Sequence, residues 1–480
     1  MLSTLIEAAD TKSKRGAIPI CPVKQGDLAV MLKKETPPLR AWAKAAGFDG
    51  ARGSVLLVPG PAGGIEKVLF GLGEGGLRGA DMWVWAHLAT RLPIGTFRLQ
   101  ARLGAKQATK AALAFALGSY RFDAYQSPAP APASGRKSKK TKADRAVLIW
   151  PEGADHHAVA RTVGAMTLVR DLINTPAGDL GPRQLAEEAR KVAKKGGATC
   201  RVIVGEQLLK KNYPAIHAVG RAAAEDPRLI DITWGSVKHP KVTLVGKGVT
   251  FDTGGLDIKP AGGMKLMKKD MGGASAVLGL ASLIMAAKLK VRLRVLIPAV
   301  ENAVGANAMR PLDVVNTRAG ITVEIGHTDA EGRVILADAL AEASREKPAL
   351  LIDCATLTGA ARVALGSELP ALFSNDDRLA GAITGAGREE EDPLWRLPLW
   401  PGYRDQVRGK TADLTNAPEG GYGGAITAAL FLERFVGADI PWAHIDMMAW
   451  NTKSRPGRPE GGEAQAIRAL FHVIWDRFGP

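Results

Sequence analysis

Three short segments of the chain combine carboxylates, cations and glycines. They read VGKGVTFDTGG at 245–255, KKDMGG at 268–273 and HTDAEGR at 327–333, and Lys259 lies between the first two. Glycines let the backbone turn sharply, so polar side chains within each segment can be aimed into one space. Four carboxylates and three cations result as candidates: Asp252, Asp270, Asp329 and Glu331, with Lys247, Lys259 and Arg333.

The four carboxylates predict a site for two divalent metal ions. Packed together without metal they would repel one another and raise one another's pKa values, whereas two dications would neutralise their four negative charges. Oxygen ligands with an amine suit Zn²⁺, Mn²⁺, Mg²⁺ or Co²⁺. The alternative is that these are unrelated surface charges at loop ends. The presence of such charges in three separate glycine-flanked segments argues against this alternative.

The elements around these segments predict an α/β fold. Strand-like runs at 242–246, 294–299 and 349–353 alternate with helical patterns at 273–290 and after Gly332. Such alternation favours a mostly parallel sheet with flanking helices, and ligands of such sheets bind at the carboxyl ends of the strands. We therefore expect a larger C-terminal catalytic domain at 177–480 and a connecting helix within 151–176.

Residues 1–150 predict a smaller N-terminal α/β domain. Its strand-like apolar runs are 27–32, 54–58, 68–72, 112–117 and 146–150. Residues 71–76 match the GxGxxG pattern of dinucleotide sites, but no Asp or Glu occurs between Asp81 and Asp123 to hold a ribose. A glycine-rich turn is therefore favoured there over a nucleotide site.

The net charge of +16 allows a nucleic-acid partner, because clustered cations bind polyanions. The densest basic run, 136–142, follows a Pro/Ala stretch within 127–145. Like charges repel in a compact element, so the segment is interpreted as a solvated loop or linker, with DNA binding as the alternative.

No apolar run is long enough to span a membrane, the amino end is unlike a signal peptide, and the three cysteines are isolated. These features predict a cytoplasmic protein.

The motifs GKGVTFDTGG at 246–255, IKP at 258–260, MKKDMGGA at 267–274 and TDAEGR at 328–333 resemble the leucine aminopeptidase family, also called cytosol aminopeptidases. The resemblance covers the chain from about residue 170 onward. It implies an enzyme that hydrolyses the first peptide bond of peptides with a free amino end, by means of a dinuclear metal site and a bridging hydroxide.

The resemblance also implies a role for each matched residue. Two metal ions, Zn²⁺ or Mn²⁺, would be held by Lys247, Asp252, Asp270, Asp329 and Glu331, with Asp252 and Glu331 bridging. Lys259 would stabilise the oxyanion, and Arg333 would hold a bicarbonate that shuttles a proton. Met267 would line the pocket for the first side chain, and the backbone near Leu357 would cradle substrate.

A homo-hexamer acting on peptides is the assembly that the resemblance implies. His327, Thr253, Gly262, Gly263 and residues 447–449 depart from the family pattern, which leaves the residue preference open. Two other classes of function remain: a nucleic-acid-binding protein on a peptidase fold, and a non-catalytic scaffold. A scaffold would more naturally have lost one of the seven charged candidates.

Overall fold

The computed structural model describes residues 2–6, 16–79, 81–127 and 145–479. These residues form two compact units, the first Met1–Gly164 with Lys453–Pro459 and the second Ala165–Thr452 with Glu460–Pro480. Helix α7 (His156–Asn174), expected at 155–174, contributes residues to both units. The basic run 136–142 lies outside the described residues, so its interpretation as a solvated loop stays a prediction.

The first unit contains a sheet in the order β1-β6-β5-β2-β4-β3, in which every pair is parallel except β3 with β4. Its elements are η1 (Leu2–Thr4), β1 (Leu5–Ile6), β2 (Ile18–Val23), η2 (Gln25–Asp27), α2 (Leu28–Lys33), α3 (Pro37–Ala45), β3 (Val55–Pro59), β4 (Ile65–Gly71), α4 (Gly76–Gly79), η3 (Met82–Trp85), α5 (Ala86–Arg91), β5 (Gly95–Leu99), α6 (Ala105–Gly118) and β6 (Ala146–Ile149).

Two of the expected strands in this unit are wrong. Residues 112–117 lie within α6 and residues 27–32 begin in η2 and continue in α2. A short, wholly apolar run fits a buried strand and a buried helix equally well, and all six residues of 112–117 are buried. The GxGxxG segment forms a turn after β4, with Gly73 at φ +69° and Gly76 at φ +55°.

The second unit is built on a mixed nine-stranded sheet in the order β16-β15-β18-β14-β9-β11-β8-β7, with β10 beside β11. The strands β18, β14, β9, β11 and β10 pair in parallel, while β8 and β15 add antiparallel pairs on either side. The predicted α/β architecture is thus confirmed, with antiparallel strands outside a parallel centre.

The elements of this unit after α7 are α8 (Pro182–Gly196), β7 (Thr199–Val204), α9 (Gln207–Lys210), α10 (Pro214–Gly220), β8 (Arg228–Trp234), β9 (Lys241–Gly246), β10 (Gly248–Asp252), α11 (Ala261–Met264), η4 (Met267–Met271), α12 (Gly272–Ala286), β11 (Arg292–Asn302), β12 (Val314–Asn316), β13 (Thr322–Glu324), α13 (Glu331–Arg345), β14 (Leu350–Ala355), α14 (Gly359–Leu365), β15 (Ala371–Ser374), α15 (Asp377–Glu389), β16 (Trp395–Arg396), η5 (Pro401–Val407), β17 (Leu414–Thr415), α16 (Gly424–Glu433), β18 (Trp442–Asp446), β19 (Trp450–Asn451), β20 (Gly461–Gly462) and α17 (Ile467–Phe478).

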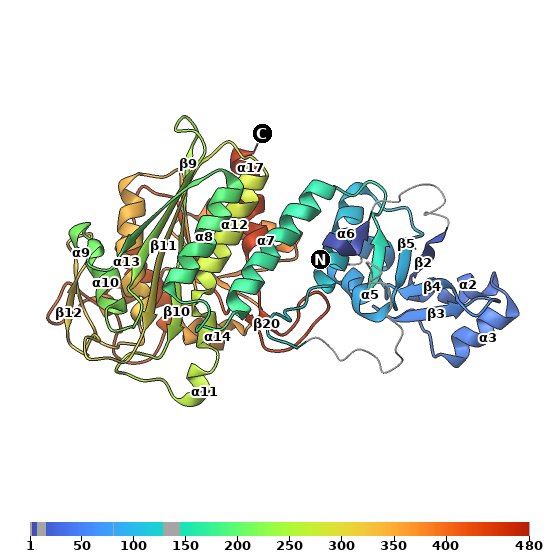
Figure 1. Ribbon diagram of the computed structural model, residues 1–480, viewed down its shortest axis with the longest axis horizontal. Coiled ribbons are helices and arrows are strands. Elements are labelled where there is room, and N and C mark those ends of the chain that lie inside the picture. The colour runs from blue at the N-terminus through green and yellow to red at the C-terminus, as the bar shows by residue number, and fades with distance from the viewer. Residues whose placement is uncertain (1, 7–15, 80, 128–144, 480) are drawn as a thin grey trace. The chain divides into compact units, whose positions relative to one another are not determined.

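Helices cover both faces of this sheet, with α8, α12 and α17 on one face and α10 and α13 on the other (Figure 1). Helix α12 is apolar nearly all round, as expected of a helix buried between a sheet and other helices. It packs closely because Gly246 and Gly273 lack side chains: a Cβ on Gly273 would lie 2.0 Å from the carbonyl oxygen of Cys354. This close packing places Asp270, just before α12, next to the strand ends.

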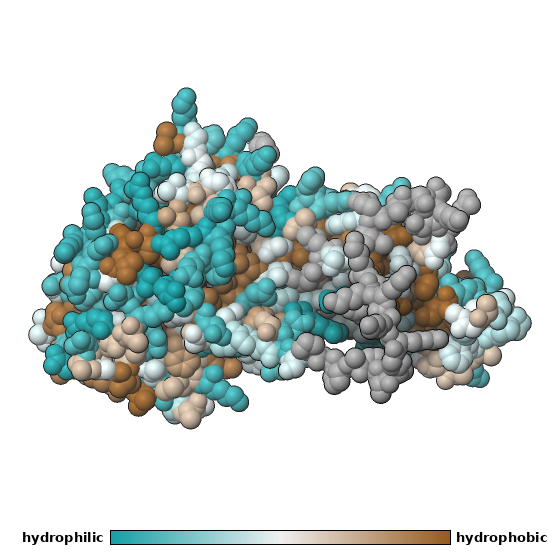
Figure 2. Space-filling view, viewed as in Figure 1, coloured by the Kyte–Doolittle hydropathy of each residue, from teal (hydrophilic) through white to brown (hydrophobic). Residues whose placement is uncertain are grey.

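The visible surface of the second unit is largely hydrophilic, with separate apolar patches (Figure 2). Among the described residues, no helix has both the length and the hydropathy that a membrane-spanning segment needs.

Candidate functional site

The site lies where the parallel strands of the second unit end. Lys247 directly follows β9, Asp252 is the last residue of β10, Asn302 ends β11, Thr356 follows β14, and Asp446 ends β18. Because these five strands run in the same direction, their carboxyl ends meet at one edge of the sheet. The expected position of the site is therefore the observed one.

The predicted residues come together at this edge. Ligand oxygens of Asp252, Asp329 and Glu331 lie within 4.8 Å of one another. Lys247 joins Asp270 to this group, since its Nζ is 2.7 Å from Asp270 Oδ2 and 2.8 Å from Glu331 Oε1. Glu331 is 1% exposed and is not among the residues that line the cavity. The cavity itself, about 690 Å³ in volume, is lined by the other eight candidates: Lys247, Asp252, Lys259, Met267, Asp270, Asp329, Arg333 and Leu357.

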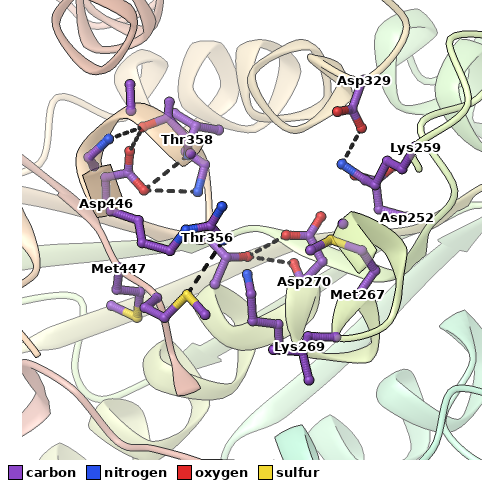
Figure 3. A pocket seen from close by; sticks show the side chains of 18 of the residues that line it. Asp252, Lys259, Met267, Lys269, Asp270, Asp329, Thr356, Thr358, Asp446 and Met447 are labelled. Carbon is purple, nitrogen blue, oxygen red and sulfur yellow. Dashed lines mark hydrogen bonds and ion pairs between the residues drawn. The ribbon is translucent and has the colours of Figure 1, made fainter. Parts of the chain in front are cut away.

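Two lysines neutralise the carboxylates of this cluster. Lys259 Nζ is 2.8 Å from Asp252 Oδ2 and also contacts Asp329 (Figure 3). Burial by itself would lower the pKa of Lys247, but Asp270, Glu331 and Asp252 outweigh it and raise that pKa. The pKa of Lys259 is raised in the same way by Asp252 and Asp329. Both amines therefore carry a proton when no dication is present.

Burial and close packing shift the pKa values of three carboxylates in the cluster. Burial, followed by repulsion from Asp252, raises the pKa of Glu331 to about 8 and that of Asp329 to about 6. Asp252 shifts in the opposite direction, because Lys247 and Lys259 outweigh its burial and lower its pKa. Raised carboxylate pKa values are expected where acidic side chains are packed closely enough to repel one another.

Three buried carboxylate oxygens accept no hydrogen bond: Asp270 Oδ2, Asp329 Oδ1 and Glu331 Oε1. Their partners are lysine ammonium groups at ion-pair distance, Lys247 for Asp270 and Glu331 and Lys259 for Asp329. Such oxygens in a protein interior normally have a donor or a metal ion as partner. The donor set, four carboxylates and one amine, therefore fits hard or borderline divalent ions.

Neighbouring side chains hold these groups in place. The Asn302 side chain donates to Asp252 Oδ1 (2.8 Å), as does the Gly254 backbone amide (2.9 Å). The Thr356 hydroxyl donates to Asp270 Oδ1 (2.8 Å), and Lys247 donates to the Thr356 carbonyl (3.0 Å). Sequence reasoning did not assign Asn302 or Thr356 to the site. Each of the two is a polar residue at the carboxyl end of a buried strand, and this position was the sequence signal that could have assigned it to the site.

Arg333 is buried close to the carboxylate cluster. Its Nη1 donates to the Asn416 carbonyl (2.7 Å), while its buried Nε has no acceptor. Burial lowers the pKa of Arg333 to about 10, with Glu331 and Asp446 opposing the shift. A buried guanidinium with a free donor is suited to hold a small anion.

Asp446 orders the loop after β14. It accepts hydrogen bonds from the Leu357 amide (2.9 Å), the Thr358 amide (3.2 Å) and the Thr358 hydroxyl (2.6 Å; Figure 3). The loop thus holds the Leu357 backbone at the cavity wall.

Sequence reasoning also missed Lys269, which is buried in the wall of the cavity and whose pKa is lowered by burial.

Carboxylates and lysines gathered at the carboxyl ends of parallel strands are the arrangement expected of a metal-binding site in an α/β enzyme. A model described as "Cytosol aminopeptidase family, catalytic domain" matches residues 167–471, and one described as "M17 aminopeptidase, N-terminal domain" matches residues 18–134. The chain therefore belongs to the cytosol aminopeptidase family, whose members are peptidase hydrolases.

Individual relatives agree with this assignment. A probable cytosol aminopeptidase of Brucella suis biovar 1 is 39% identical over 460 residues, which cover 91% of this chain and 90% of the relative. The crystal structure of a cytosol aminopeptidase from Coxiella burnetii matches with a TM-score of 0.91 and 47% identity, over 99% of both chains. A bottromycin maturation enzyme solved in complex with Mn matches with a TM-score of 0.84 and 35% identity, over 96% of this chain and 99% of that one. These comparisons support neither the nucleic-acid-binding alternative nor the scaffold.

Proposed function

We propose that the chain is an aminopeptidase that uses two divalent metal ions held by Lys247, Asp252, Asp270, Asp329 and Glu331. The observation that supports this most directly is the cluster itself, in which four carboxylates are packed together and two lysine ammonium groups provide the positive charge that dications would supply. Zn²⁺ and Mn²⁺ suit the donors, and a relative was solved with Mn.

Bound there, divalent ions would supply a Lewis acid for the scissile carbonyl and would lower the pKa of a bound water toward neutrality. Lys259 has a second task, because its ammonium lies at the same edge of the cavity and can donate to the oxyanion that develops from the carbonyl. Asn302 and Thr356 keep Asp252 and Asp270 oriented during turnover.

The remaining residues would orient the peptide. The Leu357 backbone lies at the cavity wall, where a peptide main chain can bind, and Met267 is a wall residue for the first side chain. Arg333 would hold a small anion such as bicarbonate through its free Nε, and that anion could accept a proton. We assign this chemistry to residues 177–480, after the helix within 151–176.

Removing metal tests the proposal. Chelation should abolish hydrolysis of a dipeptide amide, and adding Mn²⁺ or Zn²⁺ should restore it, with about two ions bound per chain. Acetylating the substrate's amino end should also eliminate turnover, because a free amine must be recognised. Full activity in metal-free protein, or equal rates on acetylated peptides, would refute the proposal.

We also expect a cytosolic homo-hexamer, as the names of the relatives and the family resemblance suggest. Light scattering should then give about six times the 50.6 kDa chain mass.

A further inference from the structure

Beyond the carboxylate cluster, the cavity continues along a wall of different character. This wall includes Met267, Lys269, Arg362, Met447 and Met448. A substrate whose amine and scissile carbonyl lie at the cluster has its first side chain in the remaining volume. The chemistry of this wall therefore determines which amino-terminal residues are accepted.

Lys269 is a buried cation without a counter-ion. Lys269 as a whole residue is 5% exposed. Within the described parts of the chain, no hydrogen bond or ion pair involves its ammonium. The amine extends into the cavity near Asp270 and Thr356 (Figure 3). The adjacent Lys268 differs, since its Nζ donates to the Asn174 carbonyl (2.6 Å) and lies over the Trp450 ring.

The carboxylates of the cavity already have other partners. Asp252 and Asp329 contact Lys259, Asp270 contacts Lys247, and all three are assigned above as metal ligands. Asp446 accepts three hydrogen bonds from Leu357 and Thr358. None of the four is available to pair with Lys269. A buried ammonium without a partner is energetically costly, and a ligand carboxylate would remove that cost.

A second cation lies on the same wall. Arg362, on the exposed side of α14, lines the cavity, and its Nη1 lies 3.9 Å from the Met448 sulfur. In the described parts of the chain no carboxylate lies within ion-pair distance of Arg362. Lys269 at depth and Arg362 at the exposed end thus give this wall a positive field.

We propose that this pocket selects peptides whose first residue is acidic, with Lys269 binding the side-chain carboxylate of Glu or Asp and Arg362 assisting. The proposal rests on the aminopeptidase function inferred above and adds its substrate class. Lys269 and Arg362 are specificity-determining residues, and the hydrolytic chemistry does not depend on them.

Glutamate and glutamine substrates provide the sharpest comparison, because the two side chains have the same size and differ in charge. With Mn²⁺-loaded full-length protein, kcat/KM for Glu-p-nitroanilide should exceed that for Gln-p-nitroanilide by about tenfold or more, as expected for a charge-assisted hydrogen bond. The Leu substrate should be no better than Gln. A Glu/Gln ratio of one or less in the wild-type protein would overturn the proposal.

Substitutions identify the residue responsible. Lys269→Met keeps an unbranched side chain that is one atom shorter and removes its charge, so the Glu/Gln ratio should fall to about one while the Leu substrate is still hydrolysed. Arg362→Met should lower the ratio less, because this side chain is exposed. Lys265→Met removes an exposed lysine of the same segment that does not line the cavity, and it should leave the ratio unchanged.

The two hypotheses fail differently. If no substrate of the panel is hydrolysed by metal-loaded protein, the aminopeptidase function is wrong. If Leu is hydrolysed but Glu is not preferred, or if Lys269→Met and Lys265→Met change the ratio equally, only the specificity is wrong. Should Lys269→Met not fold, the wild-type ratio and the Arg362→Met ratio still decide the question.

Discussion

At the scale of single residues, chemically identical side chains have different roles because of their neighbours. Lys247 is enclosed by Asp270 and Glu331 and is buried, whereas Lys259 contacts Asp252 and Asp329 at the cavity. An amine binds a metal only through its lone pair, so the proposed metal binding would require Lys247 to release the proton that the carboxylates stabilise. In the same proposal Lys259 keeps its proton, because it acts on an oxyanion.

This difference predicts distinct variant phenotypes. Lys247→Arg should lose one metal ion or bind it much more weakly, because guanidinium keeps its proton at physiological pH. Lys259→Ala should retain about two ions per chain but lower kcat about 10²- to 10³-fold. Metal analysis together with steady-state kinetics of both variants tests the assignment. If Lys259→Ala loses metal while Lys247→Arg keeps it, the two roles are reversed.

A glycine of the third segment makes room for Lys247. A Cβ on Gly332 would lie 2.6 Å from Lys247 Cε and 2.7 Å from Nζ. Gly332→Ala should therefore displace the amine and weaken metal binding by about tenfold or more, measured by competition with a chelator. Gly381→Ala is the matched control, since a Cβ on this helical glycine would have no other atom within 4 Å. Equal metal affinity in both variants would show that the space beside Lys247 is not required.

At the scale of elements, the strand ends supply the site and helix contacts keep it aligned. Helix α13, which begins at Glu331, is linked to α10 by the buried Asp338. The carboxylate accepts hydrogen bonds from the amides of Ala215 (2.9 Å) and Ile216 (3.2 Å), in the first turn of α10, and from the Arg318 amide (2.7 Å). It thus satisfies helix-terminal donors that α10 cannot satisfy itself.

Burial raises the pKa of Asp338 from 3.8 to about 7, although its three backbone donors oppose the shift. The folded state then binds this proton more tightly than the unfolded state. The resulting stabilisation is complete below the unfolded value and is lost as pH rises from about 4 to about 7. Asp338→Asn does not titrate and loses one acceptor, at a cost of about 1–3 kcal/mol at pH 5. Urea unfolding should show this deficit shrinking at pH 8, and a deficit that grows with pH would contradict the assignment.

At the scale of the whole molecule, the net charge of +16 does not determine the function. Its densest run, 136–142, is remote in sequence from every residue assigned to the site. If 136–142 is the solvated loop that its charge predicts, deleting it should leave kcat on a dipeptide amide within about twofold, because changes in such segments alter little. A large loss would make the segment part of the active assembly. If the intact protein binds DNA, the deletion should flatten the dependence of affinity on salt.

Features that depend on neighbouring residues in the chain could be predicted from the sequence alone. The three glycine-flanked segments, with Lys259 between the first two, contain all seven charged candidates. The ends of α8 also follow from local chemistry, because Pro182 suits a first helical turn and Gly197 takes φ +69° at the C-cap. These signals depend on residues a few positions apart. The runs 27–32 and 112–117 were misassigned because a stretch of five or six apolar residues does not itself distinguish strand from helix.

Only the tertiary structure decided which distant residues meet. Asn302 lies 50 positions from Asp252, and Thr356 lies 86 positions from Asp270, so no local pattern pairs them. The order of the parallel strands brings them together. The same is true of Lys269, whose neighbour Lys268 has the same side chain. The packing of η4 against the strand ends turns Lys268 toward a backbone carbonyl and buries Lys269 in the cavity, where no described residue forms an ion pair with it. Burial and partner are properties of the fold, and they determine what a lysine can bind.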